Sequence, residues 1–421
     1  MVRIYRFSAV RPTREEARKI AAVPYDVVTA DEARAIIAKN PESFLRVSRP
    51  DAELPGIPPH DERVYLRAQE NFLALRRSGK MQADPVPGMY IYRVLQGGDT
   101  FLGLCCCLDV DDYLQNHIRR HEQTRYDKEE DRTRHIEAVK AHNGQVVLLY
   151  RDTGSIFRFI ESLVARQPVP DAEVHPDQGG LHQIFRITDP AALERLEGLF
   201  AAIPSLYIAD GHHRAKAAVN LAERRIAAGM PVDSEILRFM GVIFAHDRVK
   251  IHGYSRLLTD LGTLTPRALL EKLNESFSVG EYGAVDGSGY NIPAKITDSQ
   301  NYHVVHMYLN GRWYECTRPI DRSAPPLAAL DVAVLQERVL KPLLGITDPR
   351  GDARLQYLGG ARPVADLETL VDSGEFRVAF AMQPVNVGTV LSIADAGGVM
   401  PPKSTWFEPK LLSGLVVHTF G

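Results

Sequence analysis

The stretch LYIADGHHR at residues 206–214 decides how the rest of the chain is interpreted. An apolar run ends at Asp210 and Gly211, and an alanine-rich segment with a helical pattern follows from Ala215 to Arg224. This order predicts a strand, a tight turn and the start of a helix. A helix N-terminus presents free backbone N–H groups and the positive end of the helix dipole, so such a turn suits an anion.

The side chains of the turn also suit a phosphate. Gly211 can adopt backbone angles closed to other residues, which lets the chain approach a ligand closely. Arg214 can hold a phosphate through a forked pair of hydrogen bonds. The alternative is an ordinary surface turn in which Asp210 caps the helix. This stretch alone leaves both interpretations open.

Length and composition indicate an ordinary globular protein. The chain has 421 residues, enough for two or three domains, with 45% hydrophobic and 24% charged residues. The formal net charge of −3 favours neither nucleic acid nor an anionic membrane as a partner. The N-terminus lacks the apolar segment of a signal peptide, and no apolar run reaches the roughly 18 residues of a membrane span. We expect a cytoplasmic protein.

Three of the four cysteines, Cys105, Cys106 and Cys107, are consecutive in an apolar run. Neighbouring side chains in a strand point to opposite faces, so the three cannot converge on one metal ion. We expect these cysteines and Cys316 to be small buried residues. A redox or metal role is the alternative.

Strands and helices alternate along the chain, which predicts an α/β or α+β fold. The clearest elements are a helix at 61–78, a hairpin of strands at 90–95 and 100–110, and a helix after a capping box formed by Thr29 and Glu32. We also expect a strand at 44–47, a helix at 257–261 and a loop at 351–360. The expected organisation is an N-terminal α/β region at 1–238, a smaller α+β insert at 239–330, and a segment at 331–421 that returns to the core.

Two further segments carry candidate ligand-binding residues. The run around 118–135 is dense in charge of both signs, and His121, Glu122 and Thr124 would contact an anion there; the alternative is a solvated helix face. The C-terminal run KSTWFEPK at 403–410 offers Lys403 as a point charge and Ser404 and Thr405 as donors to phosphate oxygens. Its alternative is a proline-stiffened loop that packs its aromatic rings into the core.

Together these motifs resemble the bacterial group named domain of unknown function 1015, nearly end to end. The resemblance rests on PYDV at 24–27, NPESFL at 40–45, HEQT at 121–124, KEEDR at 128–132, DGHHR at 210–214, LDV at 330–332 and the segment 400–415.

The DGHHR turn is also similar to the phosphate-binding turn of the ParB and sulfiredoxin superfamily, whose free serine kinase branch phosphorylates L-serine with ADP or ATP. The resemblance implies a ParB/sulfiredoxin-like mixed core elaborated with extra helices and a small β-rich region. It further implies that His212, His213 and Arg214 bind phosphate, and that Asp210 lies near the metal or the hydroxyl substrate. That branch uses an N-terminal acidic residue as base, for which Asp26 and Glu122 are both candidates here. The sequence lacks the cysteine of the sulfiredoxin turn, since His212 occupies that place, and lacks a helix-turn-helix block.

We therefore expect a nucleotide-dependent phosphotransferase for a small hydroxylated metabolite, with free L-serine as the first guess, ATP or ADP as donor and Mg²⁺ as cofactor. A nucleotide-binding regulator without turnover and a phosphatase of a phosphorylated metabolite are the alternatives. A further, minor alternative is that the adjacent His212 and His213 bind a transition metal instead of phosphate. The expected partners are the nucleotide, the substrate and a second copy of the chain. Catalysis is assigned to Asp210, Asp26 and Glu122, with Asp210 also the metal ligand. Phosphate or nucleotide binding is assigned to Gly211, His212, His213, Arg214, His121, Thr124, Lys403, Ser404 and Thr405.

Overall fold

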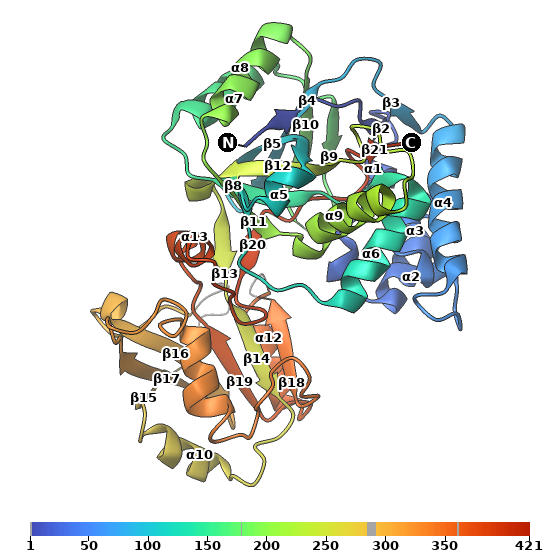
Figure 1. Ribbon diagram of the computed structural model, residues 1–421. Helices are drawn as coiled ribbons and strands as arrows, with labels where there is room; N and C mark the ends of the chain where they lie inside the picture. The colour runs from blue at the N-terminus through green and yellow to red at the C-terminus, as the bar shows by residue number, and fades with distance from the viewer. Residues whose placement is uncertain (1, 178, 284–291, 360–361) are drawn as a thin grey trace. The chain divides into compact units, whose positions relative to one another are not determined.

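The computed structural model describes residues 2–177, 179–283, 292–359 and 362–421. The chain divides into two compact units (Figure 1). The first comprises Met1–Val249 and Pro409–Gly421, and the second comprises Lys250–Glu408. The division therefore falls at 249/250 and 408/409, whereas the sequence-based segments end at 238 and 330.

The first unit is built on a mixed sheet with the strand order β6-β11-β8-β12-β5-β4-β10-β9, and β1 pairs with β5. The pairs β11–β6 and β12–β8 are parallel, and the other pairs are antiparallel. The strands are Ile4–Tyr5 (β1), Met89–Gln96 (β4), Asp99–Asp109 (β5), Ile118–Arg119 (β6), Val146–Tyr150 (β8), Ala172–Val174 (β9), Leu181–Ile187 (β10), Leu206–Asp210 (β11) and Arg238–Ala245 (β12). Two short ladders complete the unit, Val10–Pro12 (β2) with Met81–Ala83 (β3) and Ala141–His142 (β7) with His418–Thr419 (β21).

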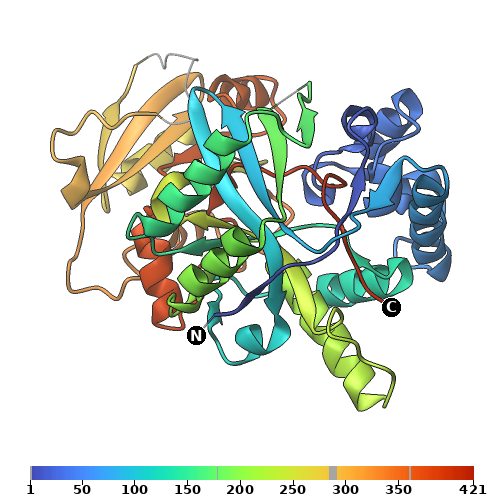
Figure 2. The same cartoon turned by 90° about the horizontal axis from the view of Figure 1, so that it is seen from above.

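Some helices of this unit pack on the sheet, and others form the rest of the unit beside it. They are Ala17–Ile20 (α1), Ala30–Lys39 (α2), Leu45–Ser48 (α3), Glu62–Arg77 (α4), Val110–Leu114 (α5), Tyr126–Val139 (α6), Ser155–Arg166 (α7), Pro190–Ala201 (α8) and His212–Ala227 (α9). Helices α7 and α8 pack side by side, as do α6 and α9 (Figures 1 and 2). The C-terminal segment, red in both views, returns to this unit. It therefore brings residues from the end of the chain next to the sheet.

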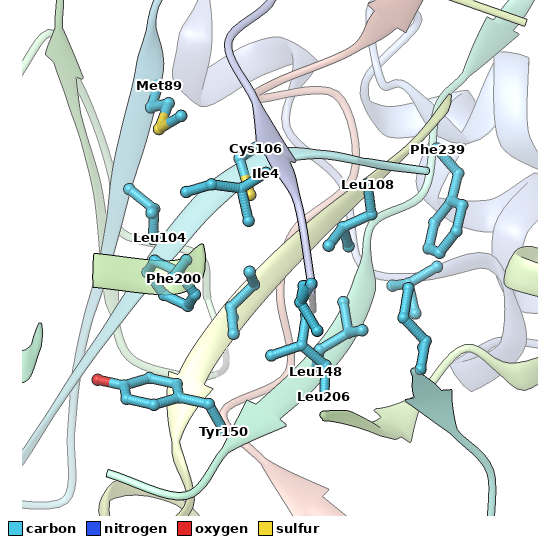
Figure 3. Close-up of a cluster of buried hydrophobic side chains, with 14 of the residues drawn as sticks. Ile4, Met89, Leu104, Cys106, Leu108, Leu148, Tyr150, Phe200, Leu206 and Phe239 are labelled. Atoms are coloured by element: carbon cyan, nitrogen blue, oxygen red, sulfur yellow. The ribbon is translucent and has the colours of Figure 1, made fainter. Parts of the chain in front are cut away.

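The main core lies between the sheet and α7, α8 and α9. Cys106 packs there with Leu104, Leu108 and Ile4 (Figure 3). Cys105 and Cys107 are buried as well but do not belong to this cluster, as the two-residue period of a strand requires. The expectation of buried cysteines on alternating faces is confirmed.

The second unit contains an antiparallel sheet with the strand order β15-β17-β16-β19-β14-β18. Its strands are Tyr254–Leu258 (β14), Ser278–Glu281 (β15), Tyr302–Leu309 (β16), Arg312–Pro319 (β17), Leu355–Gly359 (β18) and Val378–Met382 (β19). A separate ladder joins Lys250–His252 (β13) to Trp406–Glu408 (β20). The helices are Pro266–Leu273 (α10), Asp331–Leu335 (α11), Ala365–Asp372 (α12) and Val387–Asp395 (α13), and α11 continues into a π-helical turn at Gln336–Leu340. The α/β fold class is confirmed.

Long periodic elements agree with the sequence, and short apolar runs do not. The capping box of Thr29 and Glu32, the helix at 61–78 and the hairpin are all present. The strand expected at 44–47 is wrong, since Leu45–Ser48 is one helical turn. The helix expected at 257–261 is wrong too, because Tyr254–Leu258 is a strand paired on both sides. The loop expected at 351–360 contains β18, and Gly360 lies outside the described residues. Short apolar runs lack the periodicity that separates helix from strand.

Across the described ranges, none of the helices has the length and apolar character to cross a bilayer.

Candidate functional site

The turn between β11 and α9 forms as the sequence predicts. The pairing of β11 with β8 shifts register between Ile208 and Asp210, which is the mark of a β-bulge. Gly211 then takes a φ of +92° and is the N-cap of α9, a helix of 16 residues. No side chain in the described structure caps this helix. The alternative in which Asp210 serves as the cap is therefore wrong, and the first turn of α9 receives no side-chain cap among the described residues.

Arg214 lies across the turn that precedes it. Its Nη1 donates to the carbonyl of Gln145, and its Nη2 lies 3.1 Å from Asp210 Oδ2. A Cβ added to Gly211 would lie 3.1 Å from Arg214 Cζ, and one added to Gly144 would lie 3.1 Å from Arg214 Cδ. The two glycines thus leave the space that the guanidinium occupies. Its buried Nε finds no partner within the described residues, so this donor is left unsatisfied.

A second cation reaches the same carboxylate. Lys410 Nζ, from the C-terminal segment of the first unit, lies 3.5 Å from Asp210 Oδ2. Burial raises the pKa of Asp210, but Lys410, Arg214 and the neighbouring His212 outweigh burial and hold that pKa well below its ordinary value. Asp210 is therefore ionised at neutral pH and holds the two cations together.

Asp26 approaches Arg214 from the opposite end of the sequence. Its Oδ2 lies 3.8 Å from Arg214 Nη2, and 42% of its side chain is exposed. It sits in a 3₁₀ turn at Tyr25–Val27. Arg49 fixes this turn by donating to the carbonyls of Tyr25 at 3.1 Å and Val28 at 2.5 Å. Asp26 is thus a partly exposed carboxylate beside the guanidinium, and its role as a base stays a prediction.

The two buried histidines of the site are neutral. His212 is 3% exposed, and its ring meets that of His121 edge-on with centroids 4.6 Å apart. Burial lowers the pKa of His121 to about 4 and the pKa of His212 well below its ordinary value. Glu122 Oε2 lies 3.6 Å from His212 Nδ1, while the buried His212 Nε2 has no partner in the described ranges. These rings therefore add no positive charge to the site, and their binding of phosphate stays a prediction.

His213 and Thr124 form hydrogen bonds with residues at the start of α6. Arg125 donates its backbone N–H to His213 Nε2 at 3.1 Å, and the Thr124 hydroxyl donates to Glu129. Their binding of phosphate stays a prediction.

Lys403, Ser404 and Thr405 belong to the second unit. Ser404 is buried and donates to the carbonyl of Pro401 at 2.6 Å. Lys403 has a φ of +54° and places Nζ 5.2 Å from the centroid of the Tyr254 ring. The structure thus gives this segment local partners, and a role in phosphate binding stays a prediction.

Three groups that contribute to the site are not among the site residues predicted from the sequence. Lys410 stands in the quoted C-terminal run, but its pairing with Asp210 joins distant parts of the chain. The Gln145 carbonyl is a backbone group and leaves no mark in a sequence. Arg49 follows a helical turn where the sequence predicts a strand, so its contact with Tyr25 could not be expected from the sequence.

The residues fit a magnesium ion poorly at Asp210, where the sequence placed one. Oδ2 of this carboxylate is already shared by two cations, and a divalent ion there would be repelled by both. Nor do the described residues bring three metal-ligand atoms within 4.8 Å of one another around His121, Glu122 and His212. The metal role of Asp210 stays a prediction, and the transition-metal alternative gains no support.

Fold and site together define a two-unit α/β protein with a cationic turn at the uncapped N-terminus of a helix. The chain belongs to the family described as "Protein of unknown function (DUF1015)", whose model matches residues 4–333. No curated protein matches it.

Three solved structures are similar to this chain over most of its length. A free serine kinase in complex with AMP is 14% identical with a TM-score of 0.37, and the match covers 74% of this chain and 90% of that one. A conserved hypothetical protein from Pyrococcus furiosus is 14% identical with a TM-score of 0.34, covering 73% and 94%. SbnI with a C-terminal truncation from Staphylococcus aureus is 10% identical with a TM-score of 0.36, covering 74% and 86%. Overall likeness at these identities and TM-scores assigns no activity to this chain.

Proposed function

We propose that the protein is a nucleotide-dependent phosphotransferase that phosphorylates a small hydroxylated metabolite. One observation carries the proposal: Arg214 and Lys410 converge on Asp210 at the uncapped N-terminus of α9. Phosphoryl transfer needs positioning and neutralisation of charge more than covalent chemistry. Arg214, Lys410 and the backbone N–H groups at the start of α9 would supply part of that neutralisation.

The carboxylates divide the remaining roles. Asp26 is the proposed base, because it is partly exposed and stands beside the guanidinium that would hold the phosphate. The acceptor hydroxyl oxygen forms a bond to the terminal phosphorus of the nucleotide, and the bond from that phosphorus to the bridging oxygen breaks. Asp26 takes the hydroxyl proton, and the nucleotide leaves one phosphate shorter. Glu122, paired with His212, is the alternative base.

The charge balance of the site favours Mg²⁺ as a cofactor that accompanies the nucleotide. The side chains of Arg214 and Lys410 are already balanced by those of Asp210 and Asp26. A nucleotide therefore adds negative charge that the protein alone does not offset, and Mg²⁺ with waters and phosphate oxygens as ligands would supply the missing charge.

The test is an assay of purified protein with Mg²⁺, ATP or ADP, and a panel of hydroxylated amino acids. L-Serine is the first acceptor, because the DGHHR turn resembles that of free serine kinases. Formation of a phosphorylated acceptor in step with loss of one phosphate from the nucleotide supports the proposal. Nucleotide binding without any phosphorylated product supports a regulator instead, and phosphate release from O-phosphoserine without nucleotide supports a phosphatase.

A further inference from the structure

A second cluster of reactive side chains lies within the first unit. It consists of Cys107 on β5, Glu235 in the segment before β12, and His418 on β21. One ligand atom from each of the three lies within 4.8 Å of the other two. The residues come from distant parts of the chain, so the fold rather than local sequence brings them together.

The surroundings of His418 leave its ring incompletely satisfied. Its Nε2 lies 2.7 Å from Glu235 Oε2, while its buried Nδ1 has no partner in the part of the chain that the structure describes. His418 pairs directly with His142 across the β21–β7 ladder, and the two rings stack with centroids 5.5 Å apart. The buried His142 Nε2 likewise lacks a partner among the described residues. Leaving a buried donor or acceptor unpaired costs about 1–3 kcal/mol, so this cluster calls for an explanation.

The donor set has the chemistry of a zinc site. Thiolate, imidazole and carboxylate are the three ligand types that Zn²⁺ takes in proteins. The negative charges of one thiolate and one carboxylate match the charge of the ion, so a bound Zn²⁺ leaves no net charge in a buried place. Arg238 Nη1 lies 2.9 Å from Glu235 Oε1 and orients the carboxylate from outside, as partners of metal ligands do. Glu235 is the least buried of the three, with 32% of its side chain exposed, and offers a path of entry.

We propose that Cys107, Glu235 and His418 bind a zinc ion. The ion fastens the C-terminal strand β21 to β5 in the central sheet. The same C-terminal segment, Pro409–Gly421, carries Lys410 to Asp210, so the metal would hold in place a segment that contributes to the cationic turn. The proposal does not depend on the phosphotransferase activity.

Metal content and a cobalt spectrum test the assignment without any activity assay. Full-length protein dialysed without chelator is expected to retain about one zinc ion per chain, measured by mass spectrometry of the metal. After the zinc is exchanged for Co²⁺, a thiolate-to-cobalt charge-transfer band is expected in the near ultraviolet. Cys107→Ser is expected to abolish this band. Cys105→Ser, a substitution of another buried cysteine on the same face of the same strand, is the matched control and is expected to keep it.

If circular dichroism shows that Cys107→Ser does not fold, a second variant tests the proposal. Glu235→Gln is then expected to lose zinc to a chelator at a concentration at least about tenfold lower than the unsubstituted protein. Two results would overturn the proposal: folded, unsubstituted protein that retains no zinc and shows no cobalt band, or a band that survives in folded Cys107→Ser. Either result would make the cluster a plain His418–Glu235 pair beside a buried thiol.

Discussion

Lys410 Nζ and Arg214 Nη2 both lie within 3.5 Å of one oxygen, Asp210 Oδ2. The lysine comes from the C-terminal segment and the arginine from the first turn of α9. These two cations meet at one carboxylate oxygen beside a helix start that no side chain of the described structure caps. We propose that a phosphate takes over contacts that Asp210 now makes.

Replacement of Lys410 is expected to weaken nucleotide binding. Lys410→Met removes one of the two cations while keeping the length of the side chain. A charge-assisted hydrogen bond is worth about 1.5–3 kcal/mol, so we expect Kd for ADP to rise about 10-fold to 100-fold. Lys216→Met is the matched control, because Lys216 lies on α9 and pairs with Glu223. Calorimetric titration measures both, and equal losses in the two variants would remove Lys410 from the site.

Gly211 is expected to be required for two reasons: the positive φ of the turn, and the space that the Arg214 guanidinium occupies. Gly211→Ala introduces a side chain at a φ of +92° and a Cβ 3.1 Å from Arg214 Cζ. Gly229→Ala is a close control, since Gly229 has a φ of +61° and open space around its Cβ position. We expect both variants to lose about 1 kcal/mol of stability in urea unfolding, and only Gly211→Ala to lose nucleotide affinity. Unchanged affinity in folded Gly211→Ala would show that Arg214 need not occupy this place.

Asp26 is expected to act on the chemical step. Asp26→Asn keeps the shape of the side chain but cannot accept a proton as a carboxylate does. We expect kcat for phosphoryl transfer to fall about 10²-fold to 10⁴-fold while nucleotide Kd changes little. Glu122→Gln is measured in parallel, and a larger loss of kcat there would transfer the role of base to Glu122.

Buried neutral histidines predict a loss of stability in mild acid. The pKa of His121 is about 4 in the folded protein against an ordinary value of 6.5, so between these pH values the unfolded chain binds the extra proton. The free energy of unfolding therefore falls as the pH falls from about 6.5 to about 4, by up to about 1.4 kcal/mol per pH unit for this residue. His121→Gln is expected to flatten the dependence by about that amount in urea unfolding at several pH values. An unaltered slope would mean that His121 is not held neutral by burial.

The local part of the site could be predicted from the sequence, because it depends on local chemistry. Asp210, Gly211 and Arg214 stand where an apolar run meets a helical pattern, and strand, turn and helix follow from that order. The same holds for the capping box at Thr29 and for the buried cysteines. Periodicity, glycine and capping residues act over a few positions, and a single sequence shows them directly.

The non-local part could not be predicted. The contact between Lys410 and Asp210 depends on the return of the C-terminal segment to the first unit. The bulge in β11 appears only once β8 is paired with it. The meeting of Cys107 with His418 likewise requires that segment to lie beside β5, and the sequence shows each residue but no signal that joins them.

Calorimetric titration of ADP into the unsubstituted protein, Arg214→Ala and Arg224→Ala tests the central claim most directly. Arg224 lies on the same helix and pairs with Glu130, so its substitution removes an arginine from α9 without touching the turn. We predict that Arg214→Ala weakens binding at least about 10-fold, while Arg224→Ala binds as the unsubstituted protein does. Equal ADP affinity in folded Arg214→Ala and in the unsubstituted protein would contradict phosphate binding at the Asp210–Arg214 turn.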